Sequence, residues 1–349
     1  MTHQLNLTPF ATDIGLTADR DGRDLVLALL KATFRFTAAG KVEIAPAAEQ
    51  LPVFLADVHH GEPGTTSVRY ASDVVPAKPG TDVAVNGHGY GKGRKRVEVG
   101  FGVGNAQKVS VKKVLTVFGP RAWIGGILTD IAGPVAFERM PLTYEHAFGG
   151  RYEDEQGEVV CLENPVGLGF ARRVRDKARL PDLDWVPPRY RKVKDRPPPA
   201  ALGFIPAGWR QRARFAGTFD AAWSEHRRPL LPEDLDERFY NAVPQDQVLS
   251  PKLQGGERLM LLRLHPAAEE VILEMPRLRV VASFHAEDAD EDIEMVADTL
   301  LVEPDDSRFS ITFRAGKALE DPRELRSVIY QQGRAAPTDT SRGHMPRPT

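Results

Sequence analysis

The sequence is poor in cysteine and has no long hydrophobic run. Cys161 is the only cysteine among 349 residues, which excludes an intrachain disulfide and a cysteine-based zinc site and fits a reducing compartment. No apolar run approaches the ~20 residues that a membrane-spanning helix requires. The N-terminus also lacks the basic and apolar regions of a signal peptide. We therefore expect a cytoplasmic protein without a membrane partner.

A strong charge of either sign is absent as well. The 46 lysine and arginine residues nearly balance the 48 aspartate and glutamate residues, so that the formal net charge is -2. This balance gives no general attraction to nucleic acid or to anionic lipid. The hydrophobic share of 42% is ordinary for a soluble globular protein. The composition therefore predicts no nucleic-acid partner.

Motifs of cofactor-dependent and catalytic sites are lacking too. The histidines show no metal-ligand spacing, and no Gly-x-Ser-x-Gly motif of a serine hydrolase is present. Gly87–Gly93 is glycine-rich, but its lysine is not followed by Ser or Thr and a helix, as a phosphate-binding loop requires. We interpret that segment as a β-hairpin loop. The sequence predicts no metal, no cofactor, no catalytic residue and hence no enzyme.

Alternation with a period of two is present at both ends of the chain and is typical of half-buried strands. In Leu30–Thr37, Leu30, Ala32, Phe34 and Phe36 face one way, and Lys31, Thr33, Arg35 and Thr37 face the other. Further strands are predicted at Lys41–Ala45, Asp82–Asn86, Arg96–Gly102, Gln107–Phe118, Leu259–Leu264, Val271–Glu274, Leu278–Phe284, Asp298–Glu303 and Phe309–Ala315.

These strands predict a mainly β fold: an antiparallel sandwich or barrel-like scaffold with a long irregular central insertion and a few short helices. The end regions, about 1–136 and 257–333, form either two lobes bridged by residues 137–256 or one sandwich completed by both ends. We expect residues 1–333 to form a single β-rich domain and residues 334–349 to form a disordered tail.

One helix is predicted near the C-terminus. Asp321 is a suitable cap, Leu325, Val328 and Ile329 make an apolar stripe, and Gly333 is a suitable end. Shorter helices are expected to begin at Asp220 and Pro232.

The central region, roughly Phe137 to Glu257, is long and has no sustained hydrophobic period. Loops of this length are usually functional or disordered, and disordered segments lack aromatic residues. This region is aromatic-rich, with Tyr144, Phe148, Phe170, Trp185, Trp209, Phe215, Phe219, Trp223, Phe239 and Tyr240. We infer a large ordered surface that is suited to holding a partner.

Two interpretations of the polar and aromatic residues in this region remain open. Rigid aromatic side chains dominate binding hot spots between proteins, but the same residues also pack loops onto a sheet while polar groups satisfy buried amides. The candidate partner-binding or loop-anchoring residues are Tyr144, Phe148, Asn164, Phe170, Trp209, Asp220, Trp223, Asp246 and Gln247.

A basic patch follows within the same region. It suits a phosphate backbone, an acidic patch on a protein, or simply a solvated loop. Its members are Arg172, Arg173, Arg175, Arg189, Arg191 and Lys192.

Several short sequence motifs, which we call phrases, occur in this chain. Their order resembles that of a bacterial family of formerly unknown function, which is associated with the loading of type VI secretion effectors. The phrases together span about Thr33 to Arg314. They are Asp73-Val-Val-Pro-Ala-Lys-Pro-Gly-Thr-Asp82, Pro141-Leu-Thr-Tyr-Glu-His-Ala-Phe-Gly-Gly150, Asn164-Pro-Val-Gly-Leu-Gly-Phe170, Ala207-Gly-Trp-Arg210, Gly217-Thr-Phe-Asp-Ala-Ala-Trp223, Leu231-Pro-Glu-Asp234, Pro244-Gln-Asp-Gln247 and Gly255-Gly-Glu257.

The resemblance implies a cytoplasmic adaptor or chaperone. Such a protein binds an effector and helps it assemble with the trimeric needle-tip protein and the cap of the secretion spike. The resemblance supplies no catalytic residue, and the sequence leaves the oligomeric state open. Two alternatives remain: a hydrolase that uses carboxylates such as Glu145 and Asp246, and a structural component of a phage-tail-like assembly.

Overall fold

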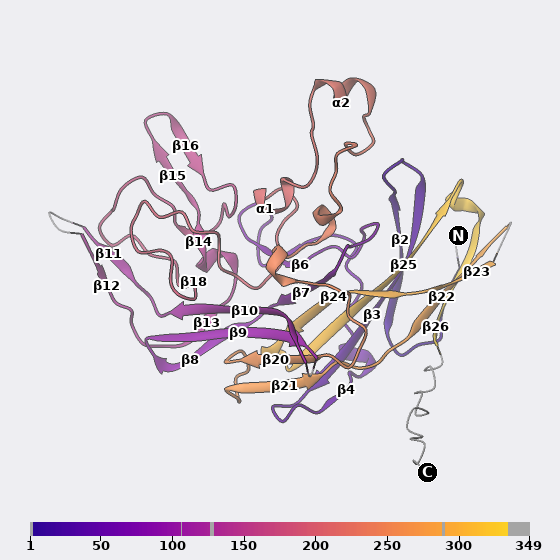
Figure 1. The fold of residues 1–349 in the computed structure, drawn as a ribbon, viewed down its shortest axis with the longest axis horizontal. Helices are drawn as coiled ribbons and strands as arrows, with labels where there is room; N and C mark the ends of the chain where they lie inside the picture. The colour runs from indigo at the N-terminus through magenta and orange to yellow at the C-terminus, as the bar shows by residue number, and fades with distance from the viewer. Residues whose placement is uncertain (1–2, 106, 126–128, 288–289, 334–349) are drawn as a thin grey trace, which may run out of the picture.

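The computed structural model describes residues 3–105, 107–125, 129–287 and 290–333. The predicted disordered tail, residues 334–349, lies outside this range. The fold is mainly β, as the sequence predicts, and its larger sheets have seven, five and four strands. Figure 1 shows these sheets across the lower and right parts of the view, with the irregular central region above and to the left.

The seven-stranded sheet combines strands from both ends of the chain. Its order is β19-β7-β24-β25-β3-β2, with β4 paired to β3. Most neighbours are antiparallel, but β7 and β24 are parallel. The strands are β2 (Ala11–Ala18), β3 (Asp24–Phe36), β4 (Val42–Ile44), β7 (Thr81–Val85), β19 (Val248–Leu249), β24 (Val296–Glu303) and β25 (Arg308–Leu319).

The five-stranded and four-stranded sheets are also assembled from distant segments. The first has the order β18-β10-β9-β20-β21, and the second has the order β1-β26-β22-β23. The strands of the first are β9 (Arg96–Gly104), β10 (Val109–Phe118), β18 (Leu183–Trp185), β20 (Arg258–Leu262) and β21 (Glu270–Glu274). Those of the second are β1 (His3–Asn6), β22 (Val280–Ala286), β23 (Asp290–Glu294) and β26 (Leu325–Gln332).

One hydrophobic core joins the three sheets. It contains Leu30 and Phe34 of β3, Phe101 of β9, Leu261 of β20 and Phe284 of β22, all of which are buried. The rings of Phe34 and Phe309 stack with their centroids 5.2 Å apart. Because strands from both ends of the chain contribute residues to this common core, the two ends complete one scaffold.

The rest of the chain forms short elements. These are β5 (Val58–His59), β6 (Val68–Tyr70), β8 (His88–Arg94), β11 (Ala122–Ile124), β12 (Asp130–Ala132), β13 (Phe137–Pro141), β14 (Phe148–Gly149), β15 (Arg151–Asp154), β16 (Gly157–Val160), β17 (Leu168–Gly169), α1 (Arg210–Ala213) and α2 (Ala221–His226). In Figure 1, the β15–β16 hairpin and the segment that carries α2 both project toward the top of the view.

The predicted C-terminal helix is wrong. The Asp321 side chain does accept a hydrogen bond from Arg323 N, but it caps only a 3₁₀ turn, Pro322–Glu324. The chain then continues as β26, which pairs with both β22 and β1. Leu325, Val328 and Tyr330 are buried in the hydrophobic core. Pairing between distant strands therefore overrides a local pattern that fits a helix.

Two smaller predictions also fail. Gly87–Gly93 is not a loop, because β8 covers most of it and pairs with β13. A side chain at Gly91 would begin 2.5 Å from the carbonyl oxygen of Phe137, so this close strand approach requires glycine. No helix begins at Pro232, which lies in an irregular turn, whereas the helix predicted at Asp220 is present as α2.

The alternation in β3 also needs a correction. Lys31 and Thr33 are not on a solvent face but are 3% and 0% exposed. On that side of the seven-stranded sheet, Asp73 in residues 71–80, which we call the strap, lies against Lys31. The Leu51 amide donates a hydrogen bond to the Thr33 hydroxyl at 2.9 Å. Both faces of this part of the sheet are therefore covered.

Candidate partner-binding surface

Five of the nine candidate residues lie inside the protein. Tyr144, Phe148, Asn164, Trp209 and Gln247 are each no more than 9% exposed. The rings of Tyr144 and Trp209 meet edge to face with their centroids 5.2 Å apart. Asn164 donates hydrogen bonds to the carbonyl oxygens of Tyr144 (2.8 Å) and Phe148 (3.0 Å). These side chains hold the central region together and have no access to a partner.

Gln247 and Asp246 connect the two largest sheets through Lys113 of β10. The Lys113 Nζ donates to the Asp246 carboxylate at 3.0 Å and to Gln247 Oε1 at 2.9 Å. The Gln247 amide then donates to the carbonyl oxygens of Val83 (2.8 Å) and Leu202 (2.9 Å). Burial lowers the pKa of Lys113, and the attraction to Asp246 opposes that shift. Asp246 itself is partly exposed, but its carboxylate is already paired.

The strap is held by buried ion pairs. Lys78 lies 2.7 Å from Asp82, and the Asp82 carboxylate also accepts hydrogen bonds from the Asn241 side chain and the Ala242 amide. Arg314 of β25 pairs with Asp298 at 2.6 Å and donates to the carbonyl oxygen of Asp73. The phrase Asp73–Asp82 is thus a structural anchor.

Two further candidates, Asp220 and Trp223, lie with Phe219 on an arm, which we define as residues 217–234. Its helix α2 is capped by Asp220, whose carboxylate accepts from Trp223 N at 2.8 Å. The Trp223 indole donates to the carbonyl oxygen of Leu230, and its ring meets Phe219 edge to face with a centroid separation of 4.7 Å. Phe219 is nonetheless 54% exposed. The arm therefore exposes the Phe219 ring, and contacts among residues of the arm stabilise its conformation.

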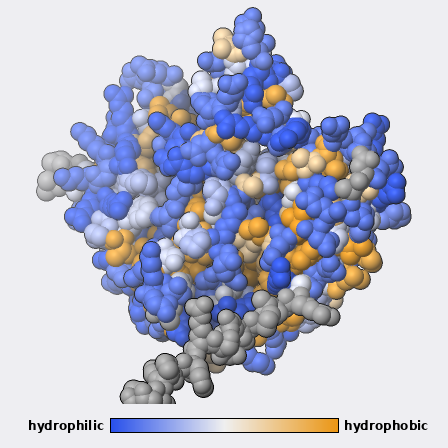
Figure 2. Space-filling view, turned by 45° about the vertical axis from the view of Figure 1, so that its right-hand side comes forward, coloured by the Kyte–Doolittle hydropathy of each residue, from blue (hydrophilic) through white to orange (hydrophobic). Residues whose placement is uncertain are grey.

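The base of the arm is closed by hydrogen bonds. Asp234 accepts from both the amide and the hydroxyl of Thr218, at 2.9 and 2.7 Å, and these bonds lower the Asp234 pKa. Arg227 reaches back to the carbonyl oxygen of Arg20 in the turn between β2 and β3. Figure 2 shows hydrophobic residues interrupting the hydrophilic surface of the projection at the top of the view.

An apolar groove lies beside this base. Its volume is about 420 Å³, and it runs between the strap, the end of β2 and the 3₁₀ turn Glu237–Tyr240 that follows the arm. The lining includes Thr17, Val74, Val75, Pro76, Phe239 and Tyr240. The groove thus adds an apolar surface on the scaffold beside the base of the arm that carries the exposed Phe219 ring.

A second and larger recess, which we call the arginine cleft, lies under the β15–β16 hairpin. Its volume is about 800 Å³. Phe170 lines it and packs against Tyr152 of β15, with ring centroids 5.3 Å apart. Arg172, Arg173 and Arg175 line it as well.

The basic patch predicted from the sequence is therefore divided. Arg172, Arg173 and Arg175 line the cleft. Arg189 instead stacks over Trp185 at 4.6 Å from the ring centroid. The loop that carries Arg191 and Lys192 is held by their backbone amides, which donate to the Asp195 carboxylate.

The comparison with known families identifies the chain. A family described as "Uncharacterized protein conserved in bacteria (DUF2169)" matches residues 21–314. This range includes all of the structural anchors, the arm and the arginine cleft.

The chain belongs to this family.

The description of the DUF2169 family specifies no activity, substrate or partner. No curated protein and no solved structure matches the chain. In the described part of this family member, no helix is long and apolar enough to cross a membrane. Nor do the described residues include a group of three or more His, Cys, Asp or Glu side chains that could hold a metal ion.

The carboxylates suggested for a hydrolase have structural partners in this DUF2169 protein. Glu145 accepts from the amide and the hydroxyl of Ser67, at 2.6 and 2.9 Å. Burial by itself raises the pKa of Glu145, but these hydrogen bonds outweigh it and the net shift is downward. A carboxyl group held ionised in this way is a poor general acid.

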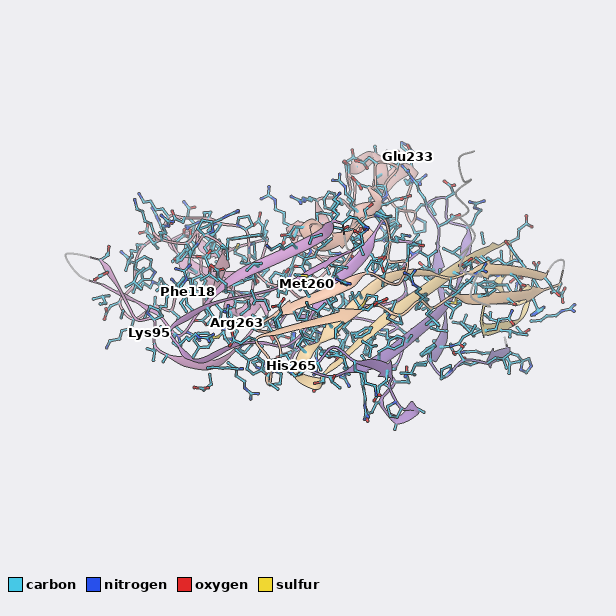
Figure 3. The ribbon with its side chains drawn as sticks, turned by 60° about the horizontal axis from the view of Figure 1, so that its bottom comes forward. Lys95, Phe118, Glu233, Met260, Arg263 and His265 are labelled. Carbon is cyan, nitrogen blue, oxygen red and sulfur yellow. The ribbon has the colours of Figure 1, made fainter. Side chains whose placement is uncertain are left out.

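A serine–histidine pair, His265 beyond β20 and Ser307 in the turn before β25, also lacks the geometry of catalytic machinery. His265 Nε2 lies 3.1 Å from the hydroxyl of Ser307, but its Nδ1 accepts a hydrogen bond from the Ala267 amide. The neutral ring therefore carries its proton on Nε2 and cannot accept one from Ser307. Figure 3 shows His265 beyond Arg263 and on the opposite side of the molecule from Glu233 in the arm.

Sequence reasoning missed two kinds of residue. The buried cations Lys31 of β3 and Arg314 of β25 carried a signal, because a charge within a mostly apolar strand needs a partner when both faces are covered. Lys78, which is also buried, lies in the strap outside any strand. Phe219 is the second kind and belongs to the motif Gly217–Trp223. Nothing in the sequence distinguishes its exposed ring from the buried ring of Phe148.

Proposed function

We propose that this DUF2169 protein is a non-catalytic cytoplasmic adaptor or chaperone. It binds a type VI secretion effector and helps to load it onto the needle-tip and cap proteins of the spike. The proposal rests on the resemblance of its ordered phrases to an effector-loading family. The observation that best supports a binding role is the exposed Phe219 ring on an arm that is fixed by internal hydrogen bonds.

The arm suits this role for an energetic reason. Burying an exposed apolar side chain contributes about 25 cal/mol per Å². A surface that is already ordered loses less conformational entropy on binding, and Trp223, Asp220 and Asp234 provide that order. The apolar groove at the base of the arm extends the same contact. The effector surface expected here is apolar and is shielded from solvent until delivery.

Co-expression tests the proposal. The chain is tagged and expressed with each effector gene that neighbours its own gene, and the soluble effector that co-purifies is measured. We expect the effector to be soluble only with the adaptor, and Phe219→Ala to reduce the complex. Leu162→Ala is a matched control, because Leu162 is 57% exposed but lies outside the arm. Effector solubility and recovery that do not depend on the chain would contradict an adaptor role.

A further inference from the structure

The arginine cleft is lined by arginines that form ion pairs and by arginines that do not. Arg151 is paired with Glu158 at 3.2 Å, and Arg179 is paired with Asp182 at 2.7 Å. Arg172, Arg173 and Arg175 have no ion-pair partner within the residues that the structure describes, and all three are exposed.

The β15–β16 hairpin brings acidic residues to the lining of the cleft. The hairpin contributes Glu153 and Asp154 of β15 and the adjoining Glu155 to the lining. The segment 169–179 contributes the unpaired arginines. An occupant of the cleft therefore meets negative charge from the hairpin and positive charge from the segment 169–179.

The start of the segment that carries the arginines is held in place by packing and hydrogen bonds. Phe170 meets Phe148 edge to face with a centroid separation of 6.2 Å. Arg196 lies over the Phe170 ring at 4.9 Å from its centroid and donates to the carbonyl oxygen of Ala171. The Tyr190 hydroxyl donates to the carbonyl oxygen of Gly169 at 2.8 Å. The cleft is thus formed before any partner arrives.

We propose that the arginine cleft binds an extended peptide segment whose acidic side chains alternate with basic ones. Side chains of an extended chain point alternately to opposite sides. Carboxylates at every second position then meet Arg172, Arg173 and Arg175, and the intervening basic residues meet the acidic hairpin. Guanidinium groups bind carboxylates through two parallel hydrogen bonds, which adds geometric selectivity. That the segment belongs to the effector rests on the proposed function.

The lining carries both positive and negative charges, and this favours a peptide over a nucleic acid as the occupant. A nucleic-acid strand carries a negative phosphate at every nucleotide, so a strand long enough to reach the arginines also approaches Glu153, Asp154 and Glu155. Like charges brought together at an interface disfavour the wrong partner. A peptide with segregated charges satisfies both sides at once.

Fluorescence anisotropy with defined probes tests the assignment on the full chain. One labelled peptide alternates glutamate and lysine, and a second has the same composition in the repeat Glu-Glu-Lys-Lys, which does not segregate the charges. A labelled single-stranded DNA is the third probe. We expect the alternating peptide to bind about tenfold more tightly than the second peptide, with an affinity that falls as salt is added.

Charge-reversal variants locate the binding. The cleft variant carries Arg172→Glu, Arg173→Glu and Arg175→Glu, and the control carries Arg189→Glu, Arg191→Glu and Lys192→Glu from the other part of the basic patch. We expect the cleft variant to lose at least about tenfold in affinity for the alternating peptide and the control variant to keep the wild-type value. Circular dichroism verifies that both variants are folded.

Three results would overturn the proposal. The first is equal affinity for the two peptides, and the second is an equal loss of peptide affinity in the cleft variant and the control variant. The third is that the DNA binds more tightly than the alternating peptide and that only the cleft variant loses this DNA binding. The last result would make the cleft a nucleic-acid site. Effector recovery is measured in parallel with unmodified protein. If the effector still co-purifies while the peptide does not bind the cleft, this assignment fails and the adaptor function stands.

Discussion

The ammonium group of Lys31 lies 2.6 Å from the carboxylate of Asp73, and both side chains are buried. Asp73 also accepts hydrogen bonds from the Phe54 amide and the Thr312 hydroxyl. Burial lowers the pKa of Lys31, while the attraction to Asp73 opposes that shift. This pair therefore attaches the strap to the middle of the seven-stranded sheet.

Removing one partner of this pair is expected to be strongly destabilising. Asp73→Ala leaves Lys31 buried without its counter-ion and should lower the free energy of unfolding by about 3–5 kcal/mol. Urea denaturation measures the change. The double variant Lys31→Met/Asp73→Ala also removes the unpaired buried charge and should recover part of the lost free energy of unfolding. Equal destabilisation of the single and double variants would contradict an energetic role for the ion pair.

The two tryptophans should respond differently to truncation. Trp209 is 9% exposed and packs on Tyr144, so Trp209→Ala should lower the stability of the whole domain by about 3–5 kcal/mol. Trp223 holds only the arm, so Trp223→Ala should leave the main unfolding transition nearly unchanged and expose the arm to protease. Thermal melts and limited proteolysis separate these effects. A matching fall in melting temperature for both variants would mean that the arm is part of the cooperative core.

The shape of the arm depends on Gly217. Its φ is +84°, and a side chain there would begin 2.7 Å from both Asp234 and Pro232. Gly64 has a similar φ of +81° but no neighbour within 4 Å. Gly64→Ala should therefore incur only the conformational cost of about 1–2 kcal/mol, whereas Gly217→Ala should also displace the arm.

Effector co-purification and urea denaturation of the two glycine variants measure this difference. Gly217→Ala is expected to reduce effector recovery as Phe219→Ala does, while Gly64→Ala retains it. Normal recovery with Gly217→Ala would show that arm geometry does not matter for binding.

Acid should weaken the anchor around Asp298. Burial by itself raises the Asp298 pKa, but Arg314 and Lys78 outweigh it, so that the pKa in the folded state lies below the ordinary value. Ionised Asp298 therefore contributes stability above the unfolded-state pKa, and this contribution is lost as the pH falls through the folded-state pKa. Urea denaturation from about pH 5 downward should show a decline. Asp298→Asn should be less stable at neutral pH and should show a shallower acid decline.

The sequence predicts the mainly β class because alternation in segments such as Leu30–Thr37 is a local signal. It does not predict β26, because Asp321 and the apolar stripe from Leu325 to Ile329 fit a helix when they are considered alone. The strand forms because β22 and β1, which come from distant parts of the chain, pair with it. It also misplaces Lys31, since the strap that covers it comes from a distant part of the chain.

The site was less predictable than the fold. The aromatic content of the central region indicates an ordered surface, but similar residue types occupy opposite environments. Tyr144 is 1% exposed and Phe219 is 54% exposed. The division of the basic patch likewise depends on where β15 and β16 place the hairpin, so that Arg172 lines the cleft and Arg189 stacks on Trp185.

The pairing of β3 with β25 has a consequence for biosynthesis. Leu30 stands opposite Phe313 in that register, so β3 emerges from the ribosome long before the strand that completes its pairing. Until β25 is synthesised, this edge of β3 presents backbone amide and carbonyl groups that lack their partner strand. Premature termination anywhere before β25 therefore yields a product that cannot complete its main sheet.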